Sequence, residues 1–130
     1  MISNESLKTV STYKKGRSGE DMACSFLESL GYRILTRNYV YKKKEVDIVA
    51  RDKNEIVFVE VKQRATDRFG QPYEAVNRKK QQSIIMVADN YISRYAIDLE
   101  ARFDIISITQ HPTLPPKIEH IKNAFIPSVI

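Results

Sequence analysis

The chain has 130 residues, of which 42% are hydrophobic and 28% charged, and these values predict one soluble globular domain over residues 1–130. A formal net charge of +5 favours a polyanionic partner, with nucleic acid ahead of an acidic membrane surface. The single cysteine, Cys24, excludes an internal disulfide and a thiolate metal cluster. No apolar run reaches membrane-spanning length and the first residues lack an apolar signal core, so we expect a cytoplasmic protein that is not inserted in a membrane.

The first predicted element is a helix. Residues 1 to about 11 are polar and are expected to form a flexible N-terminal segment. Apolar residues at helical spacing then predict a helix that ends at Gly31, a residue type that readily adopts a positive φ. Its start is open: Ser18 could cap it, or it could begin earlier and run through Gly16 and Gly19.

Strand-like segments follow, with a second amphipathic helix between the third strand and the fourth. The strands are expected at residues 32–38, 45–49, 57–62, 102–108 and 117–125. The last of these follows several prolines and is therefore expected at an edge of the sheet. Residues 63–71 are predicted to form a polar loop, and the second helix is expected to start near Pro72 and to continue to about Tyr95. This order predicts an α/β or α+β sandwich built around a mixed sheet.

Charged residues alternate with apolar ones in two neighbouring predicted strands. In the first of these strands, Glu45 and Asp47 are expected on one face, with Val46 and Ile48 on the other. In the next strand, three valines are expected to share a face: Val57, Val59 and Val61. The opposite face would then carry an acid and a lysine within otherwise hydrophobic sequence.

A hairpin between these strands would bring acids together. A two-residue loop of Lys53 and Asn54, with Asn54 tolerating the positive φ of such a turn, sets Asp47 opposite Glu60. The same register sets Glu45 opposite Lys62, and a three-residue loop or a bulge would shift it by one and separate the acids. Opposed carboxylates repel and are expected to share a proton or a cation. The alternative interpretation is a solvated sheet face with alternating charges.

Phosphodiester hydrolysis accounts for each member of this cluster. Carboxylates of Asp47 and Glu60 suit Mg²⁺ or Mn²⁺, and a metal held there can polarise a phosphate and activate a water. Lys62 can orient that water or stabilise the negative charge of the transition state. The main-chain carbonyl of Val61 is a further candidate ligand. Glu20 on the first helix is another candidate acid, although an acid in a first helical turn also simply complements the helix dipole.

The sequence gives little evidence for other kinds of catalytic or binding site. The chain has no phosphate-binding glycine loop followed by lysine and a hydroxyl residue, and no Ser-His-Asp or Cys-His set is evident. His111 and His120 lie near prolines or in a strand and are not expected to bind metal or to act as a base. Cys24 lies within the first helix, where we expect a small packing residue.

The acids and the lysine resemble a known pattern. An acid followed after a gap by Glu-x-Lys resembles the PD-(D/E)xK nuclease superfamily, with Asp47, Glu60 and Lys62 in the motif positions. A wider set of motifs, over roughly residues 13 to 110, resembles the YraN family of small bacterial proteins. These motifs are residues 16–23, 37–38, 45–48, 58–64, 70–76, Lys79 and 102–104. One departure is Lys44, where that family usually has glycine before the Glu-x-Asp element.

The resemblance implies a restriction-endonuclease-like three-layer sandwich with about five strands, similar to archaeal Holliday junction resolvases. It implies a metal-dependent deoxyribonuclease, which would prefer branched or distorted DNA, and it places Glu20 in the active site as a catalytic and metal-binding acid. Glu45 and Gln63 would support this site. Lys79 is the preferred candidate for a helix residue beside the site, whereas Arg102 and Asp104 receive no role and Phe103 is expected in the core. The candidate nucleic-acid contacts are Lys42, Lys43, Lys44, Arg64, Arg68, Arg78, Lys79 and Lys80.

Two functions from different classes stay open. The first is the Mg²⁺- or Mn²⁺-dependent deoxyribonuclease. The second is a catalytically silent nucleic-acid-binding or accessory module that uses the same fold and basic surface. An enzyme acting on sugars or lipids is a distant third, and the sequence leaves open whether the chain forms a homodimer.

Overall fold

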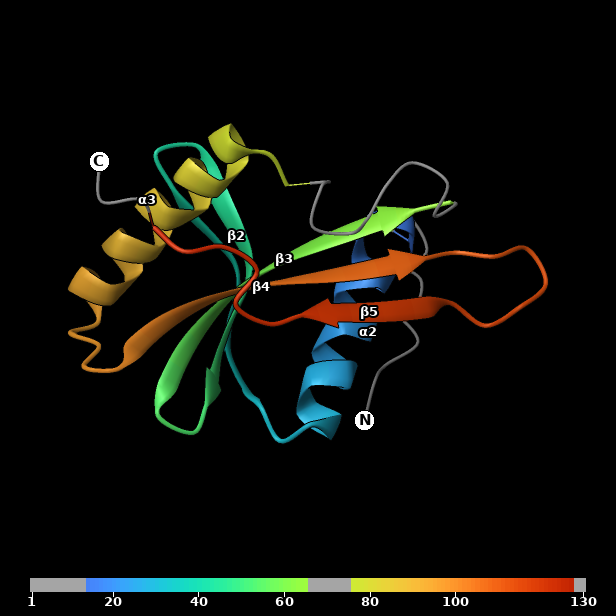
Figure 1. Cartoon of the computed structure of the whole chain (residues 1–130), viewed down its shortest axis with the longest axis horizontal. Helices are drawn as coiled ribbons and strands as arrows, with labels where there is room; N and C mark the ends of the chain where they lie inside the picture. The colour runs from blue at the N-terminus through green and yellow to red at the C-terminus, as the bar shows by residue number, and fades with distance from the viewer. Residues whose placement is uncertain (1–13, 66–75, 128–130) are drawn as a thin grey trace, which may run out of the picture.

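The computed structural model describes residues 14–65 and 76–127, and of residues 14–18 only the backbone. Its elements are α2 (Lys14–Ser29), β1 (Arg33–Tyr41), β2 (Lys44–Asp52), β3 (Glu55–Arg64), α3 (Arg78–Arg94), β4 (Glu100–Thr109) and β5 (Lys117–Ile121) (Figure 1). The predicted order of a helix, three strands, a helix and two strands is confirmed. The predicted flexible segment at residues 1–11 lies outside the described residues.

The five strands form one mixed sheet in the order β1-β2-β3-β4-β5. Neighbours pair antiparallel except β3 and β4, which are parallel, and α3 provides the crossover that a parallel pair requires. The helices cover opposite faces, because the buried residues of α2 and those of α3 belong to different core clusters. The protein is therefore an α/β sandwich with β5 at an edge of the sheet, as predicted. No described helix has the length and apolar character needed to cross a membrane.

Helix α2 ends as the sequence predicts. Gly31 adopts a φ of 93°, its N–H donates to the carbonyl of Glu28, and the N–H of Tyr32 donates to the carbonyl of Leu27. The helix already includes Lys14, so Ser18 is not its N-cap and it runs through the early glycines. Cys24 is buried in the core, which confirms its packing role.

Several predicted boundaries were wrong. Strand β1 continues to Tyr41 instead of ending at residue 38, so only Lys42 and Lys43 form the turn, with φ values of 50° and 64°. Strand β3 extends to Arg64, into the predicted polar loop. Strand β5 ends at Ile121, four residues short of the predicted end.

The start of α3 also differs from the prediction. The helix begins at Arg78 because the Asn77 side chain accepts the main-chain N–H of Lys80 at 2.9 Å and caps it. The predicted start at Pro72 lies outside the described residues. At the other end Tyr95 follows the last helical residue and is half exposed, although its ring packs on Tyr91.

The register predicted for the second hairpin is confirmed. Strand pairs run from Asp52 opposite Glu55 to Ile48 opposite Val59, around a two-residue loop. The positive φ of that loop belongs to Lys53, at 55°, and not to the asparagine that was predicted to carry it.

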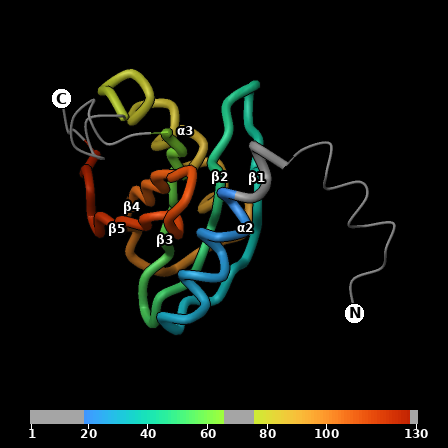
Figure 2. Tube along the Cα trace, turned by 90° about the vertical axis from the view of Figure 1, so that its right-hand side faces the viewer, coloured from blue at the N-terminus to red at the C-terminus, as the bar shows by residue number. Residues whose placement is uncertain are grey.

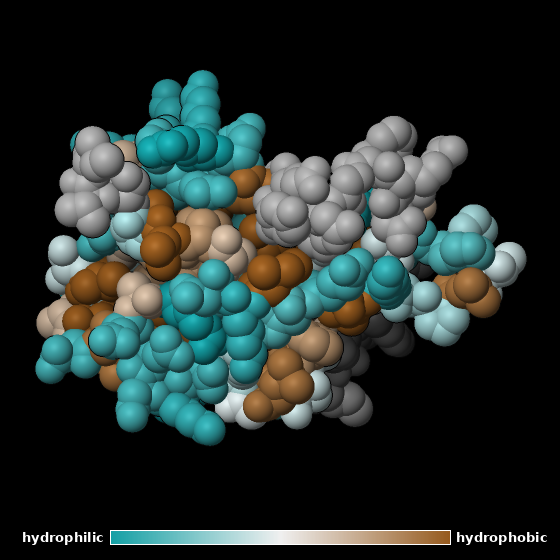
Figure 3. Space-filling view, viewed as in Figure 1, coloured by the Kyte–Doolittle hydropathy of each residue, from teal (hydrophilic) through white to brown (hydrophobic). Residues whose placement is uncertain are grey.

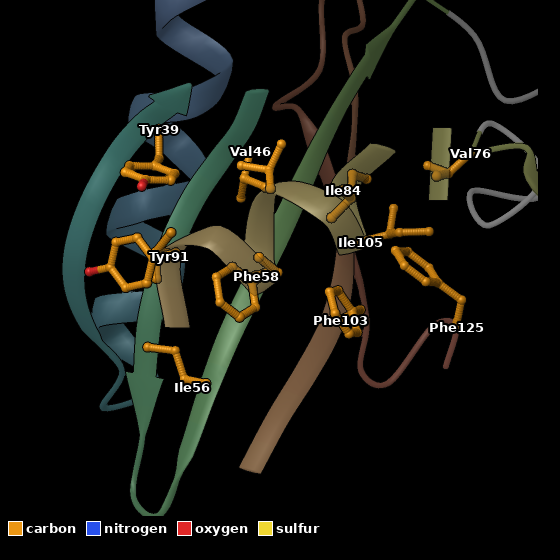
Figure 4. Packing of buried hydrophobic residues seen from close by; sticks show 13 residues of the cluster. Tyr39, Val46, Ile56, Phe58, Val76, Ile84, Tyr91, Phe103, Ile105 and Phe125 are labelled. Atoms are coloured by element: carbon orange, nitrogen blue, oxygen red, sulfur yellow. The ribbon is translucent and has the colours of Figure 1, made fainter. Parts of the chain in front are cut away.

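Two hydrophobic clusters hold the helices to the sheet. The cluster beneath α3 includes Phe58, Phe103 and Tyr91 (Figure 4), so the predicted core position of Phe103 is confirmed. The cluster beneath α2 contains Val57 and Val59, with Val61 packed against it, which confirms that the three valines share a face.

Strand β2 departs from simple alternation. Val46 packs in the cluster beneath α3, whereas Ile48 packs in the cluster beneath α2, so the expectation that both share one face was wrong. The change of face falls at Asp47, across from Asn38 of β1, whose φ of 54° breaks the extended geometry of its strand. An acid therefore stands where the strand changes the face that it presents to each core cluster.

Candidate active site

The acids predicted to oppose each other do lie together. The strand pairs of β2 and β3 end at Ile48 and Val59, and the next residue of each strand is an acid, Asp47 and Glu60. Beyond that point a side chain replaces main-chain pairing: the Asp47 Oδ2 accepts the main-chain N–H of Val61 at 2.8 Å. A side chain thus bridges the strands where main-chain pairing stops.

Burial and mutual repulsion perturb this pair. The Glu60 side chain is only 5% exposed, and Asp47 is half-buried. Burial first, and then the charge of Glu60, raise the pKa of Asp47 from 3.8 to about 7, against the opposing hydrogen bond from Val61. Without a cation Asp47 is therefore partly protonated near neutral pH.

Two lysines approach the same oxygen of Glu60. Lys62 Nζ lies 3.5 Å and Lys80 Nζ 3.7 Å from Glu60 Oε2. The other oxygen, Oε1, is buried and has no hydrogen-bond partner among the described residues. A buried carboxylate oxygen without a donor is costly, so this atom has free coordination capacity.

The helix residue at this site is Lys80 and not Lys79, the residue predicted from the sequence. Lys79 is exposed, and its main-chain carbonyl accepts the Ser83 hydroxyl at 3.2 Å. Consecutive residues of a helix point about 100° apart, so only one of these two lysines can face Glu60.

Glu20 lies on α2 and is bound by two residues of β1. Both of its oxygens accept from Asn38 Nδ2 at 3.0 Å, and Oε1 also lies 3.5 Å from Arg37 Nη2. The charge of Glu20 contributes to the raised pKa of Asp47 and of Glu45, so it belongs to the same electrostatic cluster.

Glu45 joins the acids. Burial first, and then the charge of Asp47, raise its pKa, and Lys80 opposes that shift. On β2 it pairs with Val40 of β1. Lys62 contacts Glu60 on its own strand, and the strand pairs of β2 and β3 end at Ile48 and Val59, so the predicted opposition of Glu45 and Lys62 stays a prediction.

Gln63 packs where α2 meets the end of β3. A Cβ on Gly19 would lie 2.1 Å from Gln63 Cδ and 2.4 Å from its Nε2. Glycine therefore permits the close approach of this side chain beside Glu20. The supporting position expected for Gln63 has this structural basis.

Asp47 and Glu60 supply some of the ligands that a metal site needs. No three Asp, Glu, His or Cys side chains of residues 14–65 and 76–127 form a ready metal-binding group, so Glu20 does not complete one with Asp47 and Glu60. The pair itself fits a hard cation, with the unpartnered oxygen of Glu60 beside a repelled carboxylate. Ligands beyond the pair would come from main-chain oxygens or water, and the Val61 carbonyl stays a prediction.

The predicted basic residues are distributed over several places. Lys42 and Lys43 form the tip of the β1–β2 hairpin, which extends past the sheet at the top of Figure 2, opposite the β2–β3 turn. Lys44 Nζ donates to Ser83 Oγ at 3.3 Å and joins the hairpin to α3. Hydrophilic residues gather over this hairpin and the start of α3 (Figure 3). Lys44 itself is not among the residues with positive φ, so its place does not require glycine.

Two other predicted contacts, Arg78 and Arg64, lie apart from this hairpin tip. Arg78 lines a pocket of about 500 Å³ between α3 and residues 124–126. Arg64 is half-buried at the end of β3. Arg68 lies outside the described residues.

A buried polar network that sequence patterns did not predict lies on the α2 face of the sheet. Arg102 Nε and Nη2 bind the two oxygens of Asp104 at 2.9 Å each, and Nη1 binds Asp52 at 3.0 Å and Glu55 at 2.9 Å. His120 Nε2 lies 2.7 Å from Asp104 Oδ2. The network ties the β2–β3 turn to β4 and β5. Its signal in the sequence was the alternation of an arginine and an acid within an apolar strand.

Fold and site together define a small α/β protein with a buried acid pair and two lysines where β2 and β3 part. A model of the uncharacterised protein family UPF0102 matches residues 19–108. The chain is 45% identical over 114 residues to a UPF0102 protein of Phocaeicola vulgatus, covering 88% of this chain and 93% of that protein. It is 49% identical over 111 residues to one of Geobacter sulfurreducens, covering 85% and 87%. A third relative, from Caldanaerobacter subterraneus, is 43% identical over 123 residues, covering 92% and 100%. The chain belongs to the UPF0102 family, which bears out the family resemblance of its motifs.

Proposed function

We propose that the protein is a Mg²⁺- or Mn²⁺-dependent deoxyribonuclease of the PD-(D/E)xK type. The observation that carries the proposal is the acid pair: Asp47 with a pKa raised to about 7, beside a buried Glu60 whose Oε1 has no partner among the described residues. A fold without a use for this pair would gain stability by losing one of the acids. Retaining both is the signature of a site that binds a cation or moves a proton.

Each residue of the cluster has a role in this proposal. Asp47 and Glu60 would hold the metal, which would polarise the scissile phosphate and lower the pKa of a water. Lys62, whose ammonium group already contacts Glu60, would orient that water or stabilise charge on the phosphate. Glu20 and Glu45 would add negative charge that favours cation binding, and Glu20 would reach the metal through water.

The basic end of the molecule supports a nucleic-acid substrate. The formal charge of +5, the lysines of the β1–β2 hairpin tip and the start of α3 suit a phosphate backbone that approaches the acids. The preference for DNA, and for branched or distorted DNA, rests on the resemblance to Holliday junction resolvases. A cytoplasmic location belongs to the same proposal, and a homodimer is compatible with it.

Labelled substrates test the proposal directly. Duplex, flap, fork, four-way junction, single-strand and RNA substrates would be incubated with Mn²⁺ and the wild-type protein. We expect cleavage of at least one DNA substrate, lost in Asp47→Ala, Glu60→Ala and Lys62→Ala but kept in Asp89→Ala, which removes an exposed acid of α3. Cleavage that survives Glu60→Ala unchanged would contradict the mechanism.

The second candidate is a silent binding or accessory module. It is favoured by one observation: the described residues contain no ready group of three metal-binding side chains. Titration with Mn²⁺ in a calorimeter separates the two candidates. Binding that is lost in Asp47→Ala supports the nuclease, whereas no binding at millimolar Mn²⁺, with salt-sensitive nucleic-acid binding retained, supports the module.

A further inference from the structure

We propose that Lys80 is a second functional lysine of the site: it occupies Glu60 while no metal is bound, and it moves to a substrate phosphate once a metal takes its place. The inference rests on the proposed function and names a residue that this function does not require. Its starting point is the shared oxygen, since Lys62 and Lys80 approach Glu60 Oε2 from different elements.

Lys80 is well placed to exchange partners. The side chain is 39% exposed, whereas its partner Glu60 is 5% exposed, so the ammonium group lies at the border between the buried acid and solvent. Its main chain is fixed, because its N–H donates to the capping Asn77. A lysine side chain has a flexible four-carbon stem, so the ammonium group can move while the helix stays in place.

The surrounding charges explain why Lys80 lies there in the absence of a metal. Glu60 stands beside Asp47, and the nearby Glu45 also has a raised pKa that Lys80 opposes. Lys62 alone does not offset this concentration of negative charge. The second ammonium group therefore stands in for part of the charge that a divalent cation would supply.

A metal bound by Glu60 would repel that ammonium group. A cation bound at the unpartnered Oε1 would share a carboxylate with the ammonium groups on Oε2, and like charges at that distance repel strongly in a buried setting. Lys62 is tied to β3 next to Glu60, whereas Lys80 comes from α3 and can turn toward solvent. A phosphate that approaches the metal enters from that side, where the released ammonium group can bind it.

Replacing Lys80 with methionine should have opposite effects on Mn²⁺ affinity and on DNA cleavage. In Lys80→Met the Mn²⁺ affinity measured by calorimetry should rise about threefold to tenfold, because the competing charge is gone. Cleavage at saturating Mn²⁺ should fall about tenfold to a hundredfold, because the phosphate contact is lost. Lys53→Met removes the same charge from an exposed residue of the β2–β3 turn, at the far end of β2, and should change either quantity less than about twofold. Lys80→Arg keeps the charge and should leave the Mn²⁺ affinity near that of the wild type.

The outcomes separate this inference from the proposed function. If the wild type binds Mn²⁺ and cleaves DNA, but Lys80→Met matches Lys53→Met in both measurements, Lys80 is only part of an ion pair and the inference is wrong. Weaker Mn²⁺ binding in Lys80→Met also overturns it. If the wild type binds no Mn²⁺ but Lys80→Met does, the competing role stands. If neither binds, both the inference and the metal-dependent function are wrong.

Discussion

The carboxylate of Asp47 accepts the main-chain N–H of Val61 at 2.8 Å, across the gap where β2 and β3 stop pairing. This single bond orients a half-buried acid toward β3, next to Glu60. Because the bond stabilises the ionised form while burial and Glu60 destabilise it, the pKa of Asp47 reaches about 7. Asp47 therefore gains and loses its proton near neutral pH, where its charge can be followed by experiment.

The raised pKa predicts how stability depends on pH in the metal-free protein. An acid whose pKa is higher in the folded state contributes stability that is complete below its unfolded value, here 3.8, and is lost as pH rises through about 7. In Asp47→Asn the amide oxygen can still accept the Val61 N–H, and no charge opposes Glu60. In EDTA we expect this variant to be more stable than the wild type at pH 8, by roughly 1 kcal/mol, and similar at pH 4. Urea unfolding at both pH values measures the difference, and identical pH profiles would contradict the assignment.

Metal binding should release this proton. A cation held by Asp47 and Glu60 needs both carboxylates ionised, so we expect Mn²⁺ binding below pH 7 to release protons and its affinity to rise with pH up to about 7. Calorimetry at pH 6 in two buffers of different ionisation enthalpy gives the number of protons released. No buffer dependence at pH 6, with Mn²⁺ clearly bound, would show that the metal binds elsewhere.

The contact between Gly19 and Gln63 predicts a defect in function with little cost in stability. A Cβ at residue 19 would lie 2.1 Å from the Gln63 side chain, which must then move away from α2 and from Glu20. Because that side chain is flexible and exposed, we expect Gly19→Ala to change stability by less than about 1 kcal/mol and to lower activity. The double variant Gly19→Ala, Gln63→Ala should be no less active than Gln63→Ala alone. An additional loss in the double variant would mean that Gly19 acts by another route.

The buried network around Arg102 predicts a large effect on stability. In Arg102→Leu, Asp104 keeps its bonds to His120 and to the main-chain N–H of Asn123 but loses its bidentate partner. Removing one member of a buried pair costs about 3–5 kcal/mol, whereas the exposed control Arg33→Leu should cost less than about 0.5 kcal/mol. Urea unfolding at pH 7 measures both variants, and a loss below 1 kcal/mol for Arg102→Leu would contradict the assigned role.

The same network predicts that the stability of the protein falls as the pH is lowered. Burial tends to raise the pKa of Asp104, but its hydrogen bonds from His120, Arg102 and Asn123 together lower it below its ordinary value. A lowered pKa in the folded state contributes stability that is present above the unfolded value and is lost as pH falls through the folded value. We therefore expect Asp104→Asn to lose most stability relative to the wild type at neutral pH and progressively less below pH 4. Equal losses at pH 7 and pH 3 would contradict this.

The hairpin tip predicts a contribution to nucleic-acid binding that depends on salt. Replacing Lys42 and Lys43 with Gln should weaken binding and lower the slope of log affinity against log salt by about 1–2, if each lysine contacts one phosphate. Lys53→Gln is the matched control, since it lies in the β2–β3 turn at the other end of β2 and also has a positive φ. Fluorescence anisotropy at several salt concentrations measures the slopes. An equal effect of Lys53→Gln would mean that only net charge matters.

The sequence by itself determined the order of the elements and the register of the β2–β3 hairpin. Both depend on local rules: apolar periodicity distinguishes helix from strand, and a two-residue turn leaves one register for its strands. That register was enough to predict that Asp47 and Glu60 meet. The cap at Gly31 followed for the same reason, because a positive φ there is a property of the local chain.

Only the tertiary structure decided the rest of the site and of the core. Lys80 faces Glu60 because α3 starts at a particular residue and packs at a particular rotation, and neither is specified within a few residues of sequence. Val46 and Ile48 pack in the clusters beneath different helices, and the change falls across from Asn38, which has a positive φ on another strand. Arg102, Asp104 and His120 meet because β4 pairs with β5 and packs beneath α2. In each case the deciding contacts join residues far apart in the chain, which local patterns do not encode.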